Sequence, residues 1–282
     1  MQIFTPKENF IADLNKSGLG RYKINGVNAT GVTTVTNMQA KGFLINWSAS
    51  EAYKDCINLS KDKIAEIIKS KQYAHTRKSD NAKHKGTLAH EEVEKFIKEY
   101  INSGKYVRAI IEDEEVRTSV ERFYDWAETK NVEFLGSEVS VYSEKHFFAG
   151  TFDFVCKLDG KLLLGDFKTS KQIDGTYWAQ GAAYAIAVEE NNADVKFDGI
   201  IIVRSILAKE GQVWYEKSSN GKTKKMENEA FEVAIKYTMD KEKAYFLSLL
   251  NIYRYSKNLD INKWYEAETI ENYNEDDYPI DN

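Results

Sequence analysis

Two carboxylates and one lysine are spaced so that a short hairpin places their side chains on one face of a sheet. The segment Leu158-Asp-Gly-Lys161 lies between two apolar runs, and Asp-Gly in this position favours a two-residue type I′ turn. The register that pairs the two ends of this turn also makes Asp153 oppose Asp166. Because side chains alternate along a strand, Lys168 lies on the same face as Asp166.

The opposed carboxylates, Asp153 and Asp166, destabilise a sheet unless a bound cation offsets their repulsion. Carboxylate oxygens without a thiolate suit a hard ion such as Mg²⁺ or Mn²⁺. Such an ion neutralises the non-bridging oxygens of a phosphodiester and lowers the pKa of a bound water. Lys168 could position that water or stabilise the developing charge. An isolated Asp…Asp-x-Lys pattern also occurs by chance, so the shared face is what favours hydrolysis of phosphodiester bonds.

A third acid, Glu138, lies on the strand that precedes this hairpin. If Ser143 to His146 forms the turn, Glu138 opposes Thr151, which shares a face with Asp153. Glu138 would then lie near the metal, whereas a slip of one residue would turn it to the other face.

A helix is expected from Gly86 to Tyr100, because Val93, Phe96, Ile97 and Tyr100 recur at helical spacing. His90 lies three and seven residues before members of this stripe and points inward. An inward histidine is more often a satisfied core residue than a metal ligand.

The remaining pattern predicts an α/β fold with a mainly antiparallel mixed sheet flanked by helices and an N-terminal helical annex. Asn25-Gly26 favours a type I′ hairpin, and a β-branched run follows it at Gly31–Thr36. Helices are predicted at about 48–71, 112–130, 174–190 and 227–255, with a polar loop at 79–85. Strands are predicted at 132–142, 147–158, 161–169 and 198–208, the last paired with 212–217.

Composition and charge exclude several classes of protein. The chain has 282 residues, 42% of them hydrophobic, and two cysteines, Cys56 and Cys156, too few for a disulfide framework or an iron-sulfur cluster. No secretory leader or membrane-spanning run is evident, and a reducing cytoplasm is expected. The net charge of -5 argues against a protein that coats DNA through bulk electrostatics.

The charge is unevenly distributed. The segment 61–85 carries eight basic residues against three acidic ones, and seven acids with no Lys or Arg follow Lys263. Both runs could also be ordinary solvent-exposed surface, and the acidic tail is expected to be disordered. Basic and aromatic side chains also bind single-stranded nucleic acid. The candidates are Arg77, Lys78, Lys83, Lys85 and Trp47, although core packing suits Trp47 better.

These observations divide the chain into three parts: a basic N-terminal hairpin and helical annex at 1–85, a core at 86–260 and an acidic tail at 261–282.

Five segments in order make the chain resemble the PD-(D/E)xK nuclease superfamily, and within it the RecB-like exonuclease branch. They are Gly86-Thr-x-x-His90, Glu138, Gly150-Thr-Phe-Asp153, Asp166-Phe-Lys168-Thr169 and Gln180-x-x-x-Tyr184. The N-terminal run Gly31-Val-Thr-Thr-Val, followed by Phe43-Leu-Ile-Asn-Trp47, is similar to phage proteins related to the mitochondrial genome maintenance exonuclease.

The resemblance implies a restriction-endonuclease-like core and assigns roles to its residues. His90, Asp153, Asp166 and the main-chain carbonyl of Phe167 would bind Mg²⁺ or Mn²⁺, and Lys168 would assist the attacking water. Gln180 and Tyr184, one helical turn apart, could orient Lys168 or the scissile phosphate, although ordinary helix packing would also explain them. The family's proline before its first acid is absent here, as is the cysteine ring of its iron-sulfur relatives.

The expected function is a metal-dependent DNA exonuclease acting on single-stranded ends or flaps in recombination, replication or repair, in the cytoplasm of a bacterial or phage-infected cell. One alternative is a structure-specific endonuclease of the same fold. The other is a non-catalytic nucleic-acid-binding or inhibitory protein on a nuclease fold. His75, His84 and His146 match no motif and are expected at the surface. Neither digestion polarity nor a protein partner follows from the sequence.

Overall fold

The computed structural model describes residues 6–16, 20–38, 59–60, 63, 66, 74–210, 215–217, 223–225 and 230–257. Trp47, nearly all of the helix expected at 48–71 and the acidic tail lie outside these residues. The N-terminal elements are β1 (Phe10–Ala12), β2 (Tyr22–Ile24), β3 (Val27–Asn28), β4 (Thr30–Gly31) and α1 (Val32–Thr36). They are followed by α4 (Ala74–Ser103), α5 (Glu114–Thr129), β5 (Glu133–Ser143), β6 (Phe148–Leu158), β7 (Lys161–Lys168), α6 (Gly175–Asn191), β8 (Gly199–Ser205), β9 (Tyr215–Lys217), β10 (Thr223–Lys225), β11 (Phe231–Lys236) and α7 (Asp240–Ser256).

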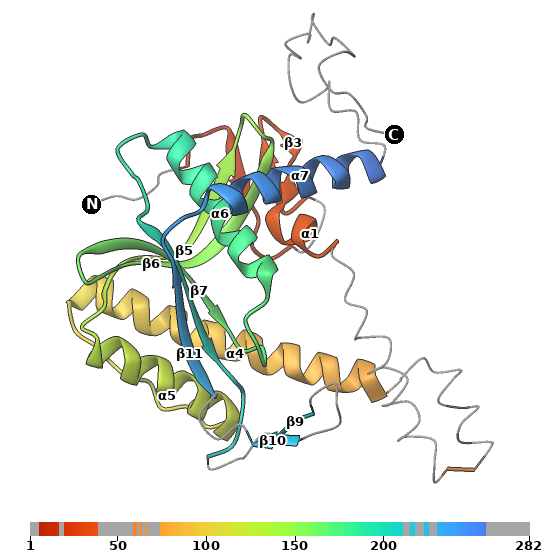
Figure 1. The fold of residues 1–282 in the computed structure, drawn as a ribbon, viewed down its shortest axis with the longest axis vertical. Coiled ribbons are helices and arrows are strands. Elements are labelled where there is room, and N and C mark those ends of the chain that lie inside the picture. The colour runs from red at the N-terminus through yellow and green to blue at the C-terminus, as the bar shows by residue number, and fades with distance from the viewer. Residues whose placement is uncertain are drawn as a thin grey trace, which may run out of the picture.

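The predicted fold class is confirmed: a mixed, mostly antiparallel sheet is flanked by helices (Figure 1). Its strand order is β11-β8-β7-β6-β4, and β5 also pairs with β6. β6 pairs antiparallel with β5 and β7, as β8 does with β11, whereas the pairs β7–β8 and β4–β6 are parallel.

Helices bury apolar residues on both faces of this sheet. On one face α1, α6 and α7 pack against Val155, Leu164 and Ile202. On the other face α4 and α5 pack against Phe154, Phe167 and Val203. Figure 1 shows α4 and α5 on the side of the sheet opposite to α6 and α7. The site is therefore built between two hydrophobic layers.

Both predicted tight turns are confirmed. Ile24 pairs with Val27 across Asn25-Gly26, and Leu158 pairs with Lys161 across Asp159-Gly160. All four turn residues have positive φ, between 49° and 78°, as a type I′ turn requires.

Several predicted boundaries are wrong. Helix α4 begins at Ala74 and includes the segment 79–85 that was expected to be a loop; residues 80–84 are exposed, so their polarity reflects solvent contact. The β-branched run continues from Gly31 into helix α1, which packs against α6.

The C-terminal part also differs from expectation. Residues 215–217 pair with β10 and not with β8, because β11 occupies the free edge of β8. The segment 231–236, expected to be helical, forms this edge strand, and the last helix begins only at Asp240.

A close contact between Phe154 and Gly165 fixes the spacing of β6 and β7 beside the site. An added Cβ at Gly165 would lie 2.0 Å from Cε2 of the Phe154 ring, and Phe154 is fully buried. We expect Gly165→Ala to lower the free energy of unfolding by about 1–3 kcal/mol through overpacking. Urea denaturation measures this change.

Gly175→Ala is the matched control, since an added Cβ there meets no atom within 4 Å. Its stability should stay within about 0.5 kcal/mol of wild type. Equal stability of the two variants would contradict the packing argument.

Candidate active site

The two carboxylates lie where the ladder between β6 and β7 ends. The ladder runs from Leu158 and Lys161 to Phe154 and Gly165 in the predicted register, and Asp153 and Asp166 occupy the next position along. Beyond the ladder, the backbone N–H of Phe167 donates to Oδ2 of Asp153 at 2.7 Å. Asp153 therefore accepts a main-chain hydrogen bond that a regular strand would give to a carbonyl.

Strand β6 is twisted locally at Asp153. Phe152 packs in the cluster with α6, whereas Phe154 packs in the cluster with α4 and α5. In a regular strand, residues two apart point to the same face. The facing residue on β5, Glu138, has a left-handed φ of 48°. Irregularities of this kind re-aim side chains next to active sites.

The predicted partner of Glu138 is wrong. Ser140, not Glu138, pairs with Thr151, and the pairs on either side of Glu138 place it level with Asp153. The reason is that Ser143 pairs with Phe148, so the turn lies one residue later than expected. This displaces the register by two residues, which keeps Glu138 beside the carboxylates.

Asp166 and Lys168 form a buried ion pair. Nζ of Lys168 lies 2.6 Å from Oδ1 of Asp166, and Asp166 is 4% exposed. Burial raises the pKa of Asp166 to about 6, although Lys168 acts in the opposite direction. Oδ2 of Asp166 is buried and has no hydrogen-bond partner among the described residues. One oxygen of this carboxylate is thus left for a ligand.

Asp153 interacts with His90, which reaches it from α4. Nδ1 of His90 lies 3.4 Å from Oδ2 of Asp153, and the imidazole packs edge-on against Phe167 at 5.2 Å between ring centroids. Burial favours the neutral acid, but His90 and Lys168 outweigh it and lower the pKa of Asp153 to about 2. Burial disfavours the imidazolium, yet Asp153 raises the pKa of His90. The two carboxylates therefore have pKa values displaced in opposite directions.

Glu138 is the third acid of the site. Burial raises its pKa to about 7, and the negative charges of Asp153 and Glu94 act in the same direction. Glu94 lies on α4 and pairs with Lys98. It was not among the site residues predicted from the sequence.

Gln180 and Tyr184 lie on α6, as predicted, but in different surroundings. Nε2 of Gln180 donates to Oγ1 of Thr36 at 3.0 Å, which ties α6 to α1. The ring of Tyr184 packs against Phe152. Burial raises the pKa of Tyr184 well above its usual value, and so do the nearby charges of Asp166 and Asp153. Tyr184 is thus within electrostatic reach of both carboxylates.

A neighbouring aromatic residue was missed by the sequence reasoning. The ring centroid of Tyr177 lies 5.1 Å from Nζ of Lys168. Tyr177 precedes Gln180 and Tyr184 by three and seven residues, so the three share one face of α6. That spacing is the signal by which it could have been found.

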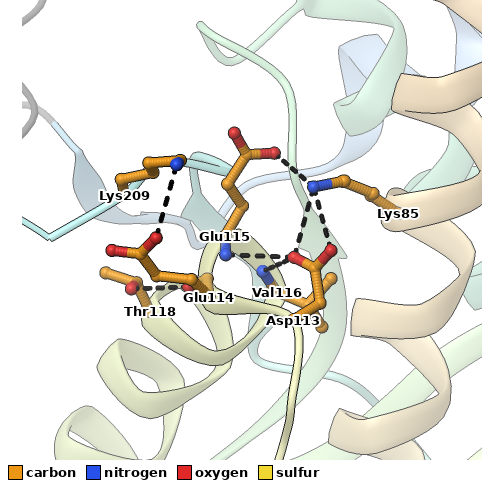
Figure 2. Close-up of polar contacts among 7 residues, drawn as sticks. All are labelled: Lys85, Asp113, Glu114, Glu115, Val116, Thr118 and Lys209. Atoms are coloured by element: carbon orange, nitrogen blue, oxygen red, sulfur yellow. Dashed lines mark hydrogen bonds and ion pairs between the residues drawn. The ribbon is translucent and has the colours of Figure 1, made fainter.

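The predicted nucleic-acid-binding lysines have acidic partners. Lys85 contacts Asp113 and Glu115 at 2.9 and 2.7 Å (Figure 2). Lys83 forms an exposed pair with Asp80 at 3.7 Å. Arg77 and Lys78 lie on α4, but their side chains are outside the described part of the chain, as Trp47 is entirely. A role of these residues with DNA therefore stays a prediction.

The three histidines outside the motif have different environments. His84 is exposed, as expected, whereas the side chain of His75 is outside the described atoms. His146, expected at the surface, is half-buried in the turn between β5 and β6. Burial lowers its pKa.

The residues present fit a hard divalent ion in their chemistry. Asp153 and Asp166 offer oxygens, His90 offers an imidazole, and Oδ2 of Asp166 has no partner. As the side chains stand, however, no three His, Cys, Asp or Glu groups in the described part of the chain are arranged to hold a metal ion. The part assigned to the Phe167 carbonyl stays a prediction.

Comparison with known proteins finds only distant structural similarity. No protein-family profile and no curated protein sequence matches the chain. A solved structure described as a "Putative exonuclease" from Eubacterium rectale is 11% identical, with a TM-score of 0.37 over 62% of this chain and 69% of the other. The structure of SSO0001 is 12% identical, with a TM-score of 0.26 over 59% and 84%. These scores are too low to support an argument about function.

Within the residues that the structure describes, no helix combines the length and apolar character needed to cross a bilayer.

Asp113 caps helix α5 and holds Lys85 at the same time. Its Oδ1 accepts from the backbone N–H groups of Glu115 and Val116 at 3.0 and 3.1 Å. We expect Asp113→Ala to lower the free energy of unfolding by about 1–2 kcal/mol, because the N-cap is lost. Glu114→Gln is the control: its exposed pair with Lys209, at 3.6 Å (Figure 2), should matter by less than about 0.5 kcal/mol. Chemical denaturation of both variants checks the difference.

The raised pKa of Glu138 predicts a pH dependence of stability. The carboxyl titrates at about 7 in the folded protein against 4.5 for a free glutamate. Between these two pKa values the folded state therefore binds more protons than the unfolded state. The stability that the protonated Glu138 carboxyl contributes is complete below this pH interval and is lost as the pH rises through about 7. We expect Glu138→Gln in EDTA to exceed wild type by on the order of 2 kcal/mol near pH 8, and by far less near pH 5.

The exposed Glu133 on the same strand provides the control, Glu133→Gln. Urea denaturation at the two pH values is the measurement. A constant difference between Glu138→Gln and wild type would contradict the assignment.

Proposed function

We propose that the chain is a Mg²⁺- or Mn²⁺-dependent DNA nuclease of the PD-(D/E)xK type. One observation carries the proposal: Asp166 is buried at the end of the β6–β7 ladder, with Lys168 on one oxygen and no partner on the other. A purely structural ion pair would satisfy both oxygens, because an orphaned buried acceptor costs stability. Perturbed carboxylates with a specific charged partner are typical of functional sites.

Asp166, Asp153 and His90 would hold the divalent ion. When bound, the ion would supply charge neutralisation at the phosphate and a more acidic water. The low pKa of Asp153 keeps that carboxylate ionised at neutral pH. Lys168 holds its ammonium beside Asp166, where it can orient a water or stabilise charge on the phosphate. Glu138 titrates near neutral pH and can hold or release a proton during the reaction.

The finer substrate assignment extends this proposal. Single-stranded ends or flaps are the proposed substrate, and recombination, replication or repair the proposed context. A structure-specific endonuclease would use the same residues, since the choice depends on the shape around the site. Linear and circular single-stranded DNA of equal length separate the two: an exonuclease degrades only the linear form.

A non-catalytic DNA-binding protein is the second candidate, favoured because no three His, Cys, Asp or Glu side chains in the described part of the chain are arranged to hold a metal ion. Calorimetry with Mn²⁺ alone distinguishes the two. A nuclease site binds the ion, and Asp166→Asn removes that binding. Heat of binding that is absent from wild type, or unchanged in the variant, would favour the non-catalytic protein.

The decisive test is cleavage of end-labelled single-stranded DNA with Mn²⁺. We expect Asp166→Ala and Lys168→Ala each to reduce the rate at least about a thousandfold, because each removes a group that acts in the transition state. Lys161→Ala, at the exposed opposite end of β7, should stay close to wild type. Circular dichroism confirms that the variants fold. Full activity in Asp166→Ala or Lys168→Ala would refute the proposal.

A further inference from the structure

The ammonium of Lys168 lies between a carboxylate and an aromatic ring. Oδ1 of Asp166 is 2.6 Å from Nζ, and the ring centroid of Tyr177 is 5.1 Å from the same atom. The Lys168 side chain is 19% exposed. A lysine within about 6 Å of a ring centroid is attracted by the negative face of the ring, and more strongly when water is largely excluded.

The position of Tyr177 is fixed by the start of α6. Asp174 caps this helix by accepting from the backbone N–H of Thr176 at 2.8 Å and from its hydroxyl at 2.6 Å. The N–H of Tyr177 donates to the carbonyl of Asp174 at 3.1 Å, and its ring packs against the cluster beneath α6. The ring is thus held by the backbone on one side and by the core on the other.

We propose that Tyr177 is a positioning residue, whose ring holds the Lys168 ammonium at the site while leaving its N–H groups available to the reacting water or phosphate. The inference rests on the proposed nuclease function. A ring attracts the ammonium without accepting its proton, unlike a second carboxylate. A divalent ion bound to Asp166 would weaken the attraction of this carboxylate for Lys168. The ring would then keep the ammonium in place.

The next residue on α6 provides a closely matched control. The ring of Trp178 lies 5.1 Å from Nζ of Lys236, which is 2.6 Å from Oε1 of Glu242. The arrangement repeats that of Lys168 distance for distance. Lys236, however, pairs with Ile200 on β8, whereas Lys168 pairs with Arg204 on the same strand. These two positions are four residues apart, which corresponds to about 13 Å along the strand. Trp178 therefore tests loss of a ring from the same helix away from the carboxylates.

The kinetic experiment compares three variants on end-labelled single-stranded DNA with Mn²⁺. We expect Tyr177→Leu to lower kcat about tenfold with little change in KM, because the lysine acts on the transition state. Tyr177→Phe keeps the ring and should recover most of this rate. Trp178→Leu should leave kcat close to wild type. A Tyr177→Leu enzyme with unchanged kcat, or a Trp178→Leu enzyme with an equal loss, would overturn the proposal.

A second readout does not depend on activity. In metal-free protein carrying ¹³C-lysine, the ε-methylene signal of Lys168, assigned with Lys168→Arg, should be displaced by the ring current of Tyr177. Tyr177→Leu should move this signal and Tyr177→Phe should largely preserve it, while Trp178→Leu moves only the signal of Lys236. If Tyr177→Leu leaves the Lys168 signal unchanged, the contact between the Tyr177 ring and the Lys168 side chain is refuted.

The two readouts separate this inference from the proposed function. If wild type cleaves DNA and Tyr177→Leu cleaves it with the same kcat, the positioning role of Tyr177 is refuted while the proposed nuclease function is not. If wild type shows no metal-dependent cleavage, the proposed function fails and the catalytic role of Tyr177 fails with it, whatever the NMR spectra show.

Discussion

The arrangement of the site depends on the end of the β6–β7 ladder, where the carboxylates of Asp153 and Asp166 are largely buried near each other. Burying like charges is costly unless cations and hydrogen bonds compensate them. Here the compensation comes from both faces of the sheet: His90 approaches Asp153 from α4, and Lys168 lies beside Asp166 on the face covered by α6. The local twist at Asp153, opposite the left-handed backbone of Glu138, is what allows one carboxylate to meet partners from the α4 side while lying beside Asp166.

The same compensation sets the two acids apart. Asp153, with a histidine, a lysine and a backbone N–H nearby, has a lowered pKa, whereas the burial of Asp166 raises its pKa despite the adjacent ammonium. Environments that push paired carboxylates apart are a common basis for distinct chemical roles. The orphaned oxygen of Asp166 makes the metal-free arrangement incomplete in hydrogen bonding, and a bound cation would complete it and stabilise the folded state by linkage.

Two N-terminal elements, β4 and α1, contact the main sheet and the helix α6 beside the site. β4 extends the main sheet by parallel pairing with β6, at Phe148 and Ala149. α1 then places Thr36 where Gln180 donates to it, and Thr36 is almost fully buried. The helix that carries Tyr177, Gln180 and Tyr184 is therefore held from the N-terminal side as well as by the sheet, so a segment distant in sequence helps to define the site.

By itself, the sequence determined the Asp159-Gly160 turn, and through it the register that brings Asp153, Asp166 and Lys168 to one strand end. Turn chemistry and side-chain alternation act over a few residues, so they can be derived without knowing the rest of the fold. Only the tertiary structure decided that Glu138 lies level with Asp153, that α4 begins at Ala74, that Gln180 bonds to Thr36 and that the Tyr177 ring covers Lys168. These depend on the packing of elements far apart in the chain, where a shift of one or two residues costs little locally and is resolved only by the layers that close around it.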